Sequence, residues 1–219
     1  QAEFSIHTCR VQKQIFREKS REIGKEEYYR LLNAAVSEKR ERLSEILRTI
    51  AATGMRIGEL RYLTVETLSR QKIEIYFKGK QRVILMARSL VIFLRDYCRR
   101  NRITSGIIFA TKNGNPVDRR NIWVEMKELC EPARVLPSKV FPHNLRHLFA
   151  RCFYERERDL VRLADYLGHS SIETTRRYTM ITSEEACARE LELGLAGNES
   201  WGGAEKNKTE EIKKGEQPL

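Results

Sequence analysis

The stretch HNLRHLFARCFYERERDLVRLADYLGH, residues 143–169, has the clearest helical patterning in the chain. Between His143 and Glu157 apolar residues recur at helical spacing and predict one buried face, made of Leu145, Leu148, Phe149 and Cys152. A second apolar face follows and is closed by Gly168, a typical helix stop; it comprises Leu160, Leu163, Ala164 and Leu167. The stretch therefore predicts two successive helices.

Three helices are predicted before residue 64. The first begins near Lys25, the second precedes the break at Thr53-Gly54, and the third runs from Met55 to Leu63. Apolar residues at positions i, i+3, i+4 and i+7 support the first two, namely Tyr28, Leu31, Leu32 and Ala35, then Leu43, Ile46, Leu47 and Ile50.

In the middle of the chain the period of the apolar residues changes. Ile73, Ile75 and Phe77 alternate, Lys78-Gly79-Lys80 forms a turn, and Val83 to Met86 runs back, which predicts a hairpin with lysines at its tip. The remaining expectations are a helix at 89–100, a possible strand at 107–109, a turn at 113–116 and a helix at 118–130. The predicted fold class is mainly α with a small antiparallel β-sheet (α+β).

Composition narrows the class of protein. The net charge is +11, and the last 24 residues hold four lysines and five glutamates, so the preceding body carries +12. Such a basic body favours a polyanionic partner, most often nucleic acid, although a merely solubilising surface would also be basic. No apolar run is long enough for a membrane helix and no signal peptide is apparent, so a cytoplasmic protein is expected.

The five cysteines are scattered and never spaced as C-x-x-C, which argues against both a disulfide framework and a zinc ribbon. Free, mostly buried thiols are expected at Cys9, Cys98, Cys130, Cys152 and Cys187. The pair His143 and His147, at i and i+4, could bind zinc, but no third ligand with suitable spacing accompanies them. His147 is instead expected to pack within the core.

Four local patterns occur in order along the chain: TGMRIGEL at 53–60, Lys78-Gly79-Lys80, HNLRH at 143–147 and Leu167-Gly168-His169, with Tyr178 nine residues beyond His169. Together they resemble the signature of the tyrosine recombinase (phage integrase) family, including the integrases of phages and conjugative transposons. The resemblance covers roughly residues 22–195 and implies that family's catalytic-domain fold.

The residue types suit DNA strand exchange. A phosphodiester must be broken without losing its energy, and an ester to a protein nucleophile such as a tyrosine conserves it. The transition state gains negative charge on the non-bridging oxygens, which the planar donor forks of Arg56 and Arg146 can clamp. His143 and Arg146 are three residues apart on a predicted helix, so both are expected on one face.

The resemblance implies a role for each matching residue. Tyr178 is the implied nucleophile, which forms a 3′-phosphotyrosine, while Arg56 and Arg146 hold the scissile phosphate and His169 donates a hydrogen bond to it. The remaining implied roles are Lys78 as general acid for the leaving 5′ oxygen, His143 as proton acceptor for the tyrosine, and Glu59 as a buttress of the site. Lys80 is the alternative to Lys78, and no metal or other cofactor is implied.

The resemblance also implies partners and an organisation. Double-stranded DNA is the expected substrate, and a helix at about 183–195 is expected to support self-association into a tetramer on DNA. Residues 1–22 are expected to be a lead-in from a missing N-terminal DNA-binding domain, residues 23–195 the catalytic domain, and residues 196–219 a disordered tail. Ser170-x-x-Glu173 and Thr182-x-x-Glu185 have the capping-box form. Weak, salt-sensitive DNA binding is expected of this piece alone.

Two other functions fit parts of the pattern. A type IB topoisomerase shares the nucleophile and its clamp, but the helix beyond Tyr178 favours a recombinase. A DNA-binding module that has lost its activity is disfavoured because Arg56, Arg146 and Tyr178 are intact. An RNA-binding domain lacks support, since neither an RNP-like aromatic motif nor a GXXG loop is present.

Overall fold

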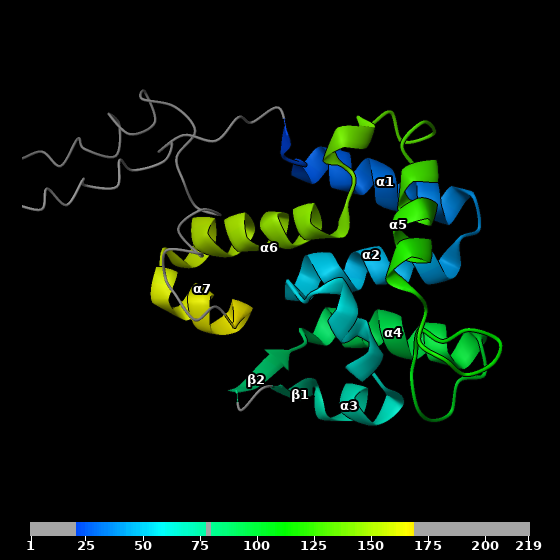
Figure 1. Ribbon diagram of the computed structural model, residues 1–219, viewed down its shortest axis with the longest axis vertical. Coiled ribbons are helices and arrows are strands. Elements are labelled where there is room, and N and C mark those ends of the chain that lie inside the picture. The colour runs from blue at the N-terminus through cyan, green and yellow to red at the C-terminus, as the bar shows by residue number, and fades with distance from the viewer. Residues whose placement is uncertain (1–20, 78–79, 169–219) are drawn as a thin grey trace, which may run out of the picture. The chain divides into compact units, whose positions relative to one another are not determined.

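The computed structural model describes residues 21–77 and 80–168 (Figure 1). In chain order the elements are α1 (Lys25–Ser37), α2 (Glu41–Thr53), the 3-10 helix η2 (Ile57–Tyr62), α3 (Val65–Arg70), β1 (Lys72–Phe77), β2 (Lys80–Leu85), α4 (Arg88–Arg100), α5 (Arg119–Glu128), the 3-10 helix η3 (Pro137–Lys139), α6 (Pro142–Glu157) and α7 (Leu160–Leu167).

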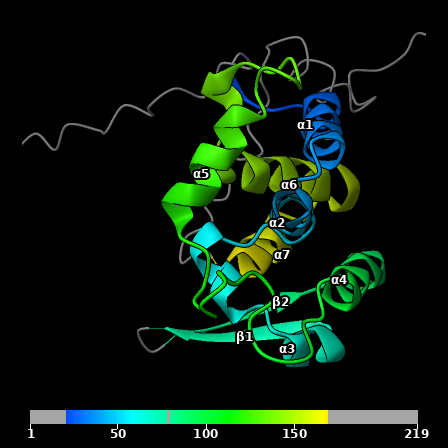
Figure 2. The same ribbon diagram turned by 90° about the vertical axis from the view of Figure 1, so that its right-hand side faces the viewer.

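Helix α2 lies at the centre of the helical part. It packs against α1, α4, α5 and α6, which surround it in two perpendicular views (Figures 1 and 2). Leu47 and Ile50 of α2 are completely buried, so the helix contributes apolar side chains in several directions. The helix ends at Gly54, whose φ of 62° lies in the left-handed region that glycine adopts without strain.

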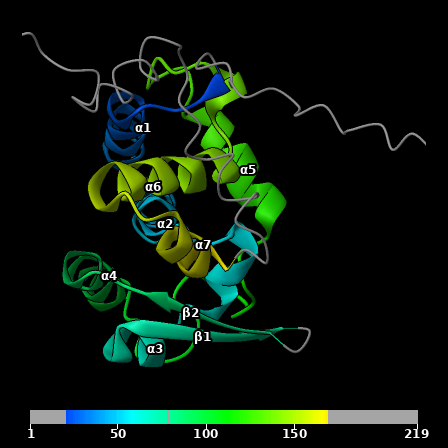
Figure 3. The ribbon, with the colours of Figure 1, turned by 90° about the vertical axis from the view of Figure 1, so that its left-hand side faces the viewer.

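The β-hairpin lies beside α3, and α7 contacts β2 (Figure 3). The register is antiparallel and pairs Ile73 with Ile84 and Ile75 with Arg82. Ile73, Ile75 and Ile84 are buried, so these pairs form the inward face of the hairpin. Arg82 therefore stands on the same face as these three buried isoleucines.

The predicted fold class is confirmed. The helix predicted to begin near Lys25, the helix predicted to end at Thr53-Gly54 and the helices predicted at 89–100, 118–130, 143–157 and 160–167 are all present. The hairpin is also confirmed. Gly168 ends α7 with a φ of 62°, as a C-terminal glycine stop should. The buried face of α6 is narrower than predicted, because Phe149 and Cys152 are only partly buried.

The prediction of a helix from Met55 to Leu63 is wrong, because the segment forms a shorter 3-10 helix instead. The chain is extended at Arg56, forms η2 and is extended again at Leu63. A separate helix, α3, then starts at Thr64, whose hydroxyl accepts a hydrogen bond from the backbone N–H of Thr67. The extended backbone at Arg56 and at Leu63 therefore limits the helical part of this segment to the short 3-10 helix between them.

The predicted strand at 107–109 is also absent from the described residues. Only two isolated bridges form, between Thr64 and Ile107 and between Ala110 and Pro116. The backbone N–H of Ile108 donates to Leu63, whereas the Phe109 carbonyl accepts from Val117. Because successive residues bond to different segments, no ladder develops, yet Ile108 and Phe109 are buried.

Three of the five cysteines lie in the described part, and all three are free: Cys98 and Cys130 are buried and Cys152 is partly buried. The carboxylate of Glu22 is buried and forms an ion pair with Arg151 of α6. In the part of the chain that the structure describes, no helix is long and apolar enough to cross a membrane. The predicted boundaries at residues 22 and 195, both capping boxes and the tail fall partly or wholly outside the described residues.

Candidate functional site

Arg146 is a buried arginine on the second turn of α6. Only 2% of its surface is exposed. Its Nη1 donates to the carbonyl oxygen of Gly54 at 2.5 Å and its Nη2 donates to that of Leu167 at 2.7 Å. A guanidinium bears such burial only when hydrogen bonds replace the water that it loses. Arg146 thus joins the C-terminal ends of α2 and α7.

Arg56 lies two residues after Gly54, at the extended position before η2. Its side chain is half exposed. Its backbone N–H donates to Oε2 of Glu59 at 2.7 Å, and its Nη1 donates to Oε1 of the same carboxylate at 3.0 Å. Its Nη2 reaches the carbonyl oxygen of Gly168 at 3.5 Å. Glu59 therefore orients Arg56 through both its backbone and its side chain.

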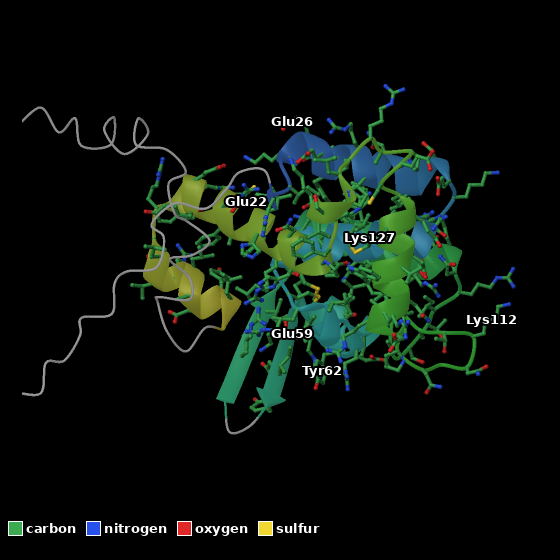
Figure 4. All side chains as sticks on the ribbon, turned by 45° about the horizontal axis from the view of Figure 1, so that its top comes forward. Glu22, Glu26, Glu59, Tyr62, Lys112 and Lys127 are labelled. Atoms are coloured by element: carbon green, nitrogen blue, oxygen red, sulfur yellow. The ribbon has the colours of Figure 1, made fainter. Side chains whose placement is uncertain are left out.

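A third arginine, Arg82 of β2, completes the cluster, although it belongs to none of the four sequence patterns. Its Nη1 lies 2.5 Å and 2.6 Å from the two carboxylate oxygens of Glu59, and its Nη2 donates to the carbonyl oxygen of Tyr166 at 3.1 Å. Figure 4, which labels Glu59, shows that residue beside the base of the hairpin. Strand alternation could have revealed Arg82, because it shares the inward face with Ile84.

These three arginines converge on one helix end. The carbonyl groups of Tyr166, Leu167 and Gly168 accept hydrogen bonds from Arg82, Arg146 and Arg56, respectively. The last carbonyls of a helix have no partners within the helix and carry partial negative charge. The C-terminus of α7 therefore gathers three guanidinium groups next to the point where His169 follows in sequence.

The charges of this cluster are strongly coupled. Burial alone would raise the pKa of the Glu59 carboxyl, but the positive charge of Arg82 and the hydrogen bonds from Arg56 and Arg82 bring its pKa below the ordinary value. Burial also lowers the pKa of Arg82, and Glu59 opposes that effect. Glu59 is thus an ionised carboxylate at neutral pH, set between two guanidinium groups.

The two histidines of α6 differ in their surroundings. His143 is exposed, whereas His147, one turn later, is buried, which confirms the expected packing of His147. Their rings lie edge to face with centroids 4.6 Å apart. Among the described residues, no three His, Cys, Asp or Glu side chains are close enough to hold a metal ion.

The described residues thus bring together Arg56, Glu59 and Arg146, with His143 on the same helix as Arg146. The other predicted site residues, Lys78, His169 and Tyr178, lie outside the described residues. The backbone of Lys80, the alternative to Lys78 as the general acid, begins strand β2.

Comparisons with known proteins identify the family that the chain resembles. Residues 21–185 match the model of the phage integrase family. The tyrosine recombinase XerA of Pyrococcus furiosus is 31% identical over 170 residues, which are 74% of this chain and 58% of that protein. The chain spans about half the length of the curated relatives that it matches.

Two solved structures share the fold. The crystal structure of XerA recombinase has a TM-score of 0.66 at 26% identity and covers 84% of this chain and 65% of its own. The XerH site-specific recombinase bound to difH substrate, described as a pre-cleavage complex, has a TM-score of 0.62 at 26% identity and covers 77% and 52%, respectively. Both likenesses extend over most of the chain.

Proposed function

The chain belongs to the phage integrase family, and from this membership and the arginine cluster we propose that it is a site-specific tyrosine recombinase. It cleaves and rejoins double-stranded DNA through a covalent 3′-phosphotyrosine intermediate and serves the integration or excision of a mobile element. Similar proteins carry the names tyrosine recombinase and site-specific recombinase, and the XerH recombinase is bound to its difH substrate.

The observation that carries the proposal is the shared attachment of Arg56 and Arg146 to the end of α7. Their guanidinium groups bond to the adjacent carbonyls of Gly168 and Leu167. Two guanidinium groups held close together by fixed acceptors form a preorganised site for an anion. Arg56 is also half exposed, so a phosphate can reach it from solvent. A scissile phosphate, whose transition state gains negative charge, is the anion that such a clamp suits.

In the proposed reaction the hydroxyl oxygen of Tyr178 attacks the phosphorus while Arg56 and Arg146 hold the non-bridging oxygens. The new bond joins the tyrosine to the 3′ phosphate, and the bond from phosphorus to the 5′ oxygen breaks. In the rejoining step, the 5′ hydroxyl of a partner strand attacks the phosphotyrosine and releases the tyrosine. The ester conserves the energy of the original phosphodiester in between.

The proton transfers are assigned to residues that the sequence pattern supplies. Lys78 protonates the departing 5′ oxygen, with Lys80 as the alternative, and His143 accepts the proton of the tyrosine hydroxyl. His169 donates a hydrogen bond to the phosphate. Glu59 orients Arg56, a role that its hydrogen bonds to both the backbone and the side chain of Arg56 support.

Assembly and location follow from the same proposal. Strand exchange needs more than one active site, so we propose that the protein forms a tetramer on DNA through the segment at about 183–195. We also propose that it acts in the cytoplasm, where the DNA is accessible. Sedimentation of the protein with and without duplex DNA tests the assembly. A tetramer only in the presence of DNA supports it, whereas a monomer on DNA that relaxes supercoils would indicate topoisomerase chemistry.

Covalent trapping tests the proposed chemistry directly. Nicked suicide duplexes tiled across the DNA that flanks the gene are incubated with wild-type protein, Tyr178→Phe and Arg146→Ala, and denaturing gels reveal any protein–DNA adduct. We expect an adduct with wild type and none with Tyr178→Phe. An adduct that persists in Tyr178→Phe would show that Tyr178 is not the nucleophile. The absence of an adduct with the full-length wild-type protein would indicate a DNA-binding module without activity.

A further inference from the structure

Arg82 is a charged side chain in an apolar position. It faces inward from β2, opposite Ile75, and only 9% of the side chain is exposed. Burying a guanidinium is costly unless hydrogen bonds and an opposite charge compensate for the lost water. An aliphatic residue would fill this position in the hairpin at less cost, so the reason for an arginine must lie in what it contacts.

Those contacts connect three segments of the site. One nitrogen of Arg82 bridges both oxygens of Glu59 in η2, and another donates to the carbonyl of Tyr166 in α7. The side chain also lies against Gly168, because a methyl group at that position would lie 2.5 Å from Cδ of Arg82. A side chain at position 168 would therefore displace Arg82. The hairpin, the Arg56 segment and the end of α7 are thus held together by one residue.

Arg82 also sets the charge of the cluster. Glu59 contacts both Arg56 and Arg82, so these three side chains together carry a net charge of +1. If Arg82 were neutral, the mostly buried carboxylate of Glu59 would neutralise Arg56 and the trio would carry no net charge. An anion would then meet an arginine whose charge is already paired, and its attraction would be weaker.

We propose that Arg82 is a positioning residue of the active site: it neutralises Glu59, leaves the charge of Arg56 available to the scissile phosphate, and holds the end of α7 in place. This inference rests on the proposed function. Arg82 itself makes its contacts with protein groups, and its effect on the reaction passes through Arg56.

The test measures single-turnover adduct formation by Arg82→Met, with the protein as its gene encodes it, on the nicked duplexes that trap the wild type. We expect the rate to fall on the order of 10- to 100-fold, as misplaced catalytic groups typically cause. Replacing the scissile phosphate by a neutral methylphosphonate removes the charge that Arg56 must stabilise. The loss on that substrate should be much smaller than on the phosphodiester, and Arg56→Ala should show the same pattern.

A double variant separates charge from mere packing. Arg82→Met/Glu59→Gln removes the carboxylate along with the arginine, and a glutamine can still accept the hydrogen bond from the backbone of Arg56. If Arg82 acts by neutralising Glu59, the double variant should cleave faster than Arg82→Met alone. If Arg82 serves only to stabilise the fold, the double variant should be no faster than the single one, and that result overturns the proposal.

Arg151→Met is the matched control. Arg151 also joins a buried glutamate, Glu22, and a backbone carbonyl, that of Ile23, but it belongs to none of the site contacts. The Arg151→Met variant should lose about as much thermal stability as Arg82→Met. At temperatures well below its melting temperature it should keep the cleavage rate of the wild type. An Arg82→Met protein that cleaves like wild type, or an equal loss in Arg151→Met, refutes the inference alone. A wild type that forms no adduct refutes the proposed function, and the inference falls with it.

Discussion

The guanidinium of Arg146 donates to the carbonyl oxygen of Gly54 at 2.5 Å, although 92 residues separate the two. Through this bond a side chain of α6 closes the C-terminal end of α2. The other nitrogen of Arg146 bonds to the end of α7. The residue that the sequence pattern assigns to the phosphate clamp is therefore also a structural connection among three helices.

This double role predicts that Arg146→Lys destabilises the fold as well as the site. A lysine ammonium is a single point donor on a flexible stem and cannot reproduce the fork that serves both carbonyls. Leaving one buried carbonyl without its donor should cost about 1–3 kcal/mol in the free energy of unfolding. Urea denaturation measures this. Arg61→Lys is the control, because Arg61 makes an exposed bond to the Gly58 carbonyl and should change stability by less than about 0.5 kcal/mol.

Gly54 should tolerate no side chain. Its φ of 62° strains any other residue by about 1–2 kcal/mol, and an added methyl group would lie 2.4 Å from Cδ1 of Phe149. Gly114→Ala is the matched control, since Gly114 has a φ of 77° with nothing within 4 Å of an added methyl. Gly54→Ala should therefore be about 1–3 kcal/mol less stable than Gly114→Ala in denaturant titrations. Equal losses would show that backbone strain alone matters at position 54.

The elements that local sequence determines were predictable. The period of apolar residues identified α6 and α7, and Gly168 marked the end of α7, because these features depend on neighbours within a few residues. The alternation of Ile73 and Ile75 likewise predicted the hairpin. Arg56, Glu59 and Arg146 were singled out by the resemblance of their patterns, and the structure brings these three together.

Strand alternation places Arg82 on the inward face of the hairpin, but the distant partners that compensate for its burial were not predictable. Arg82 is buried because Glu59, 23 residues earlier, and Tyr166, 84 residues later, supply its hydrogen bonds. Neither partner is visible in the periodicity of β2. The error at 55–63 has a similar origin, since an apolar pattern does not distinguish an α-helix from a 3-10 turn followed by a capped helix at Thr64.

The lowered pKa of Glu59 predicts a pH dependence of stability. Because the pKa of this carboxyl is below its ordinary value in the folded protein, its contribution is fully present above about pH 4.5 and is lost as the pH falls through the folded pKa. Glu59→Gln should therefore be less stable than wild type near neutral pH, and the difference should shrink in acid. Urea denaturation at a series of pH values measures this. A difference that stays constant with pH would mean that Glu59 does not titrate in the expected range.

Tyr28 predicts the opposite dependence at high pH. Burial raises its pKa to about 12, so the stability that comes from its neutral form is fully present below about pH 10 and is lost as the pH rises toward about 12. Tyr28→Phe should lose less stability than wild type across that interval in denaturant titrations. Tyr29→Phe is the control, because Tyr29 is adjacent but 58% exposed and should follow the wild-type curve. If Tyr29→Phe flattened the curve as strongly, burial of Tyr28 would not be the cause.

Arg119 should contact a DNA phosphate. Arg119 is the first residue of α5 and lies against η2. A Cβ atom added to Gly58 would lie 3.7 Å from the Cδ of Arg119, and Gly58 is two residues from Arg56. The logarithm of DNA affinity should fall linearly with the logarithm of salt concentration, and Arg119→Ala should reduce the slope by about 1 for one lost phosphate contact. Fluorescence anisotropy with a labelled duplex measures the slope. Arg99→Ala is the control, because Arg99 is 81% exposed at the far end of α4 and pairs with Asp96. A slope equally reduced in both variants would show that total charge, rather than the position of Arg119 beside Arg56, governs binding.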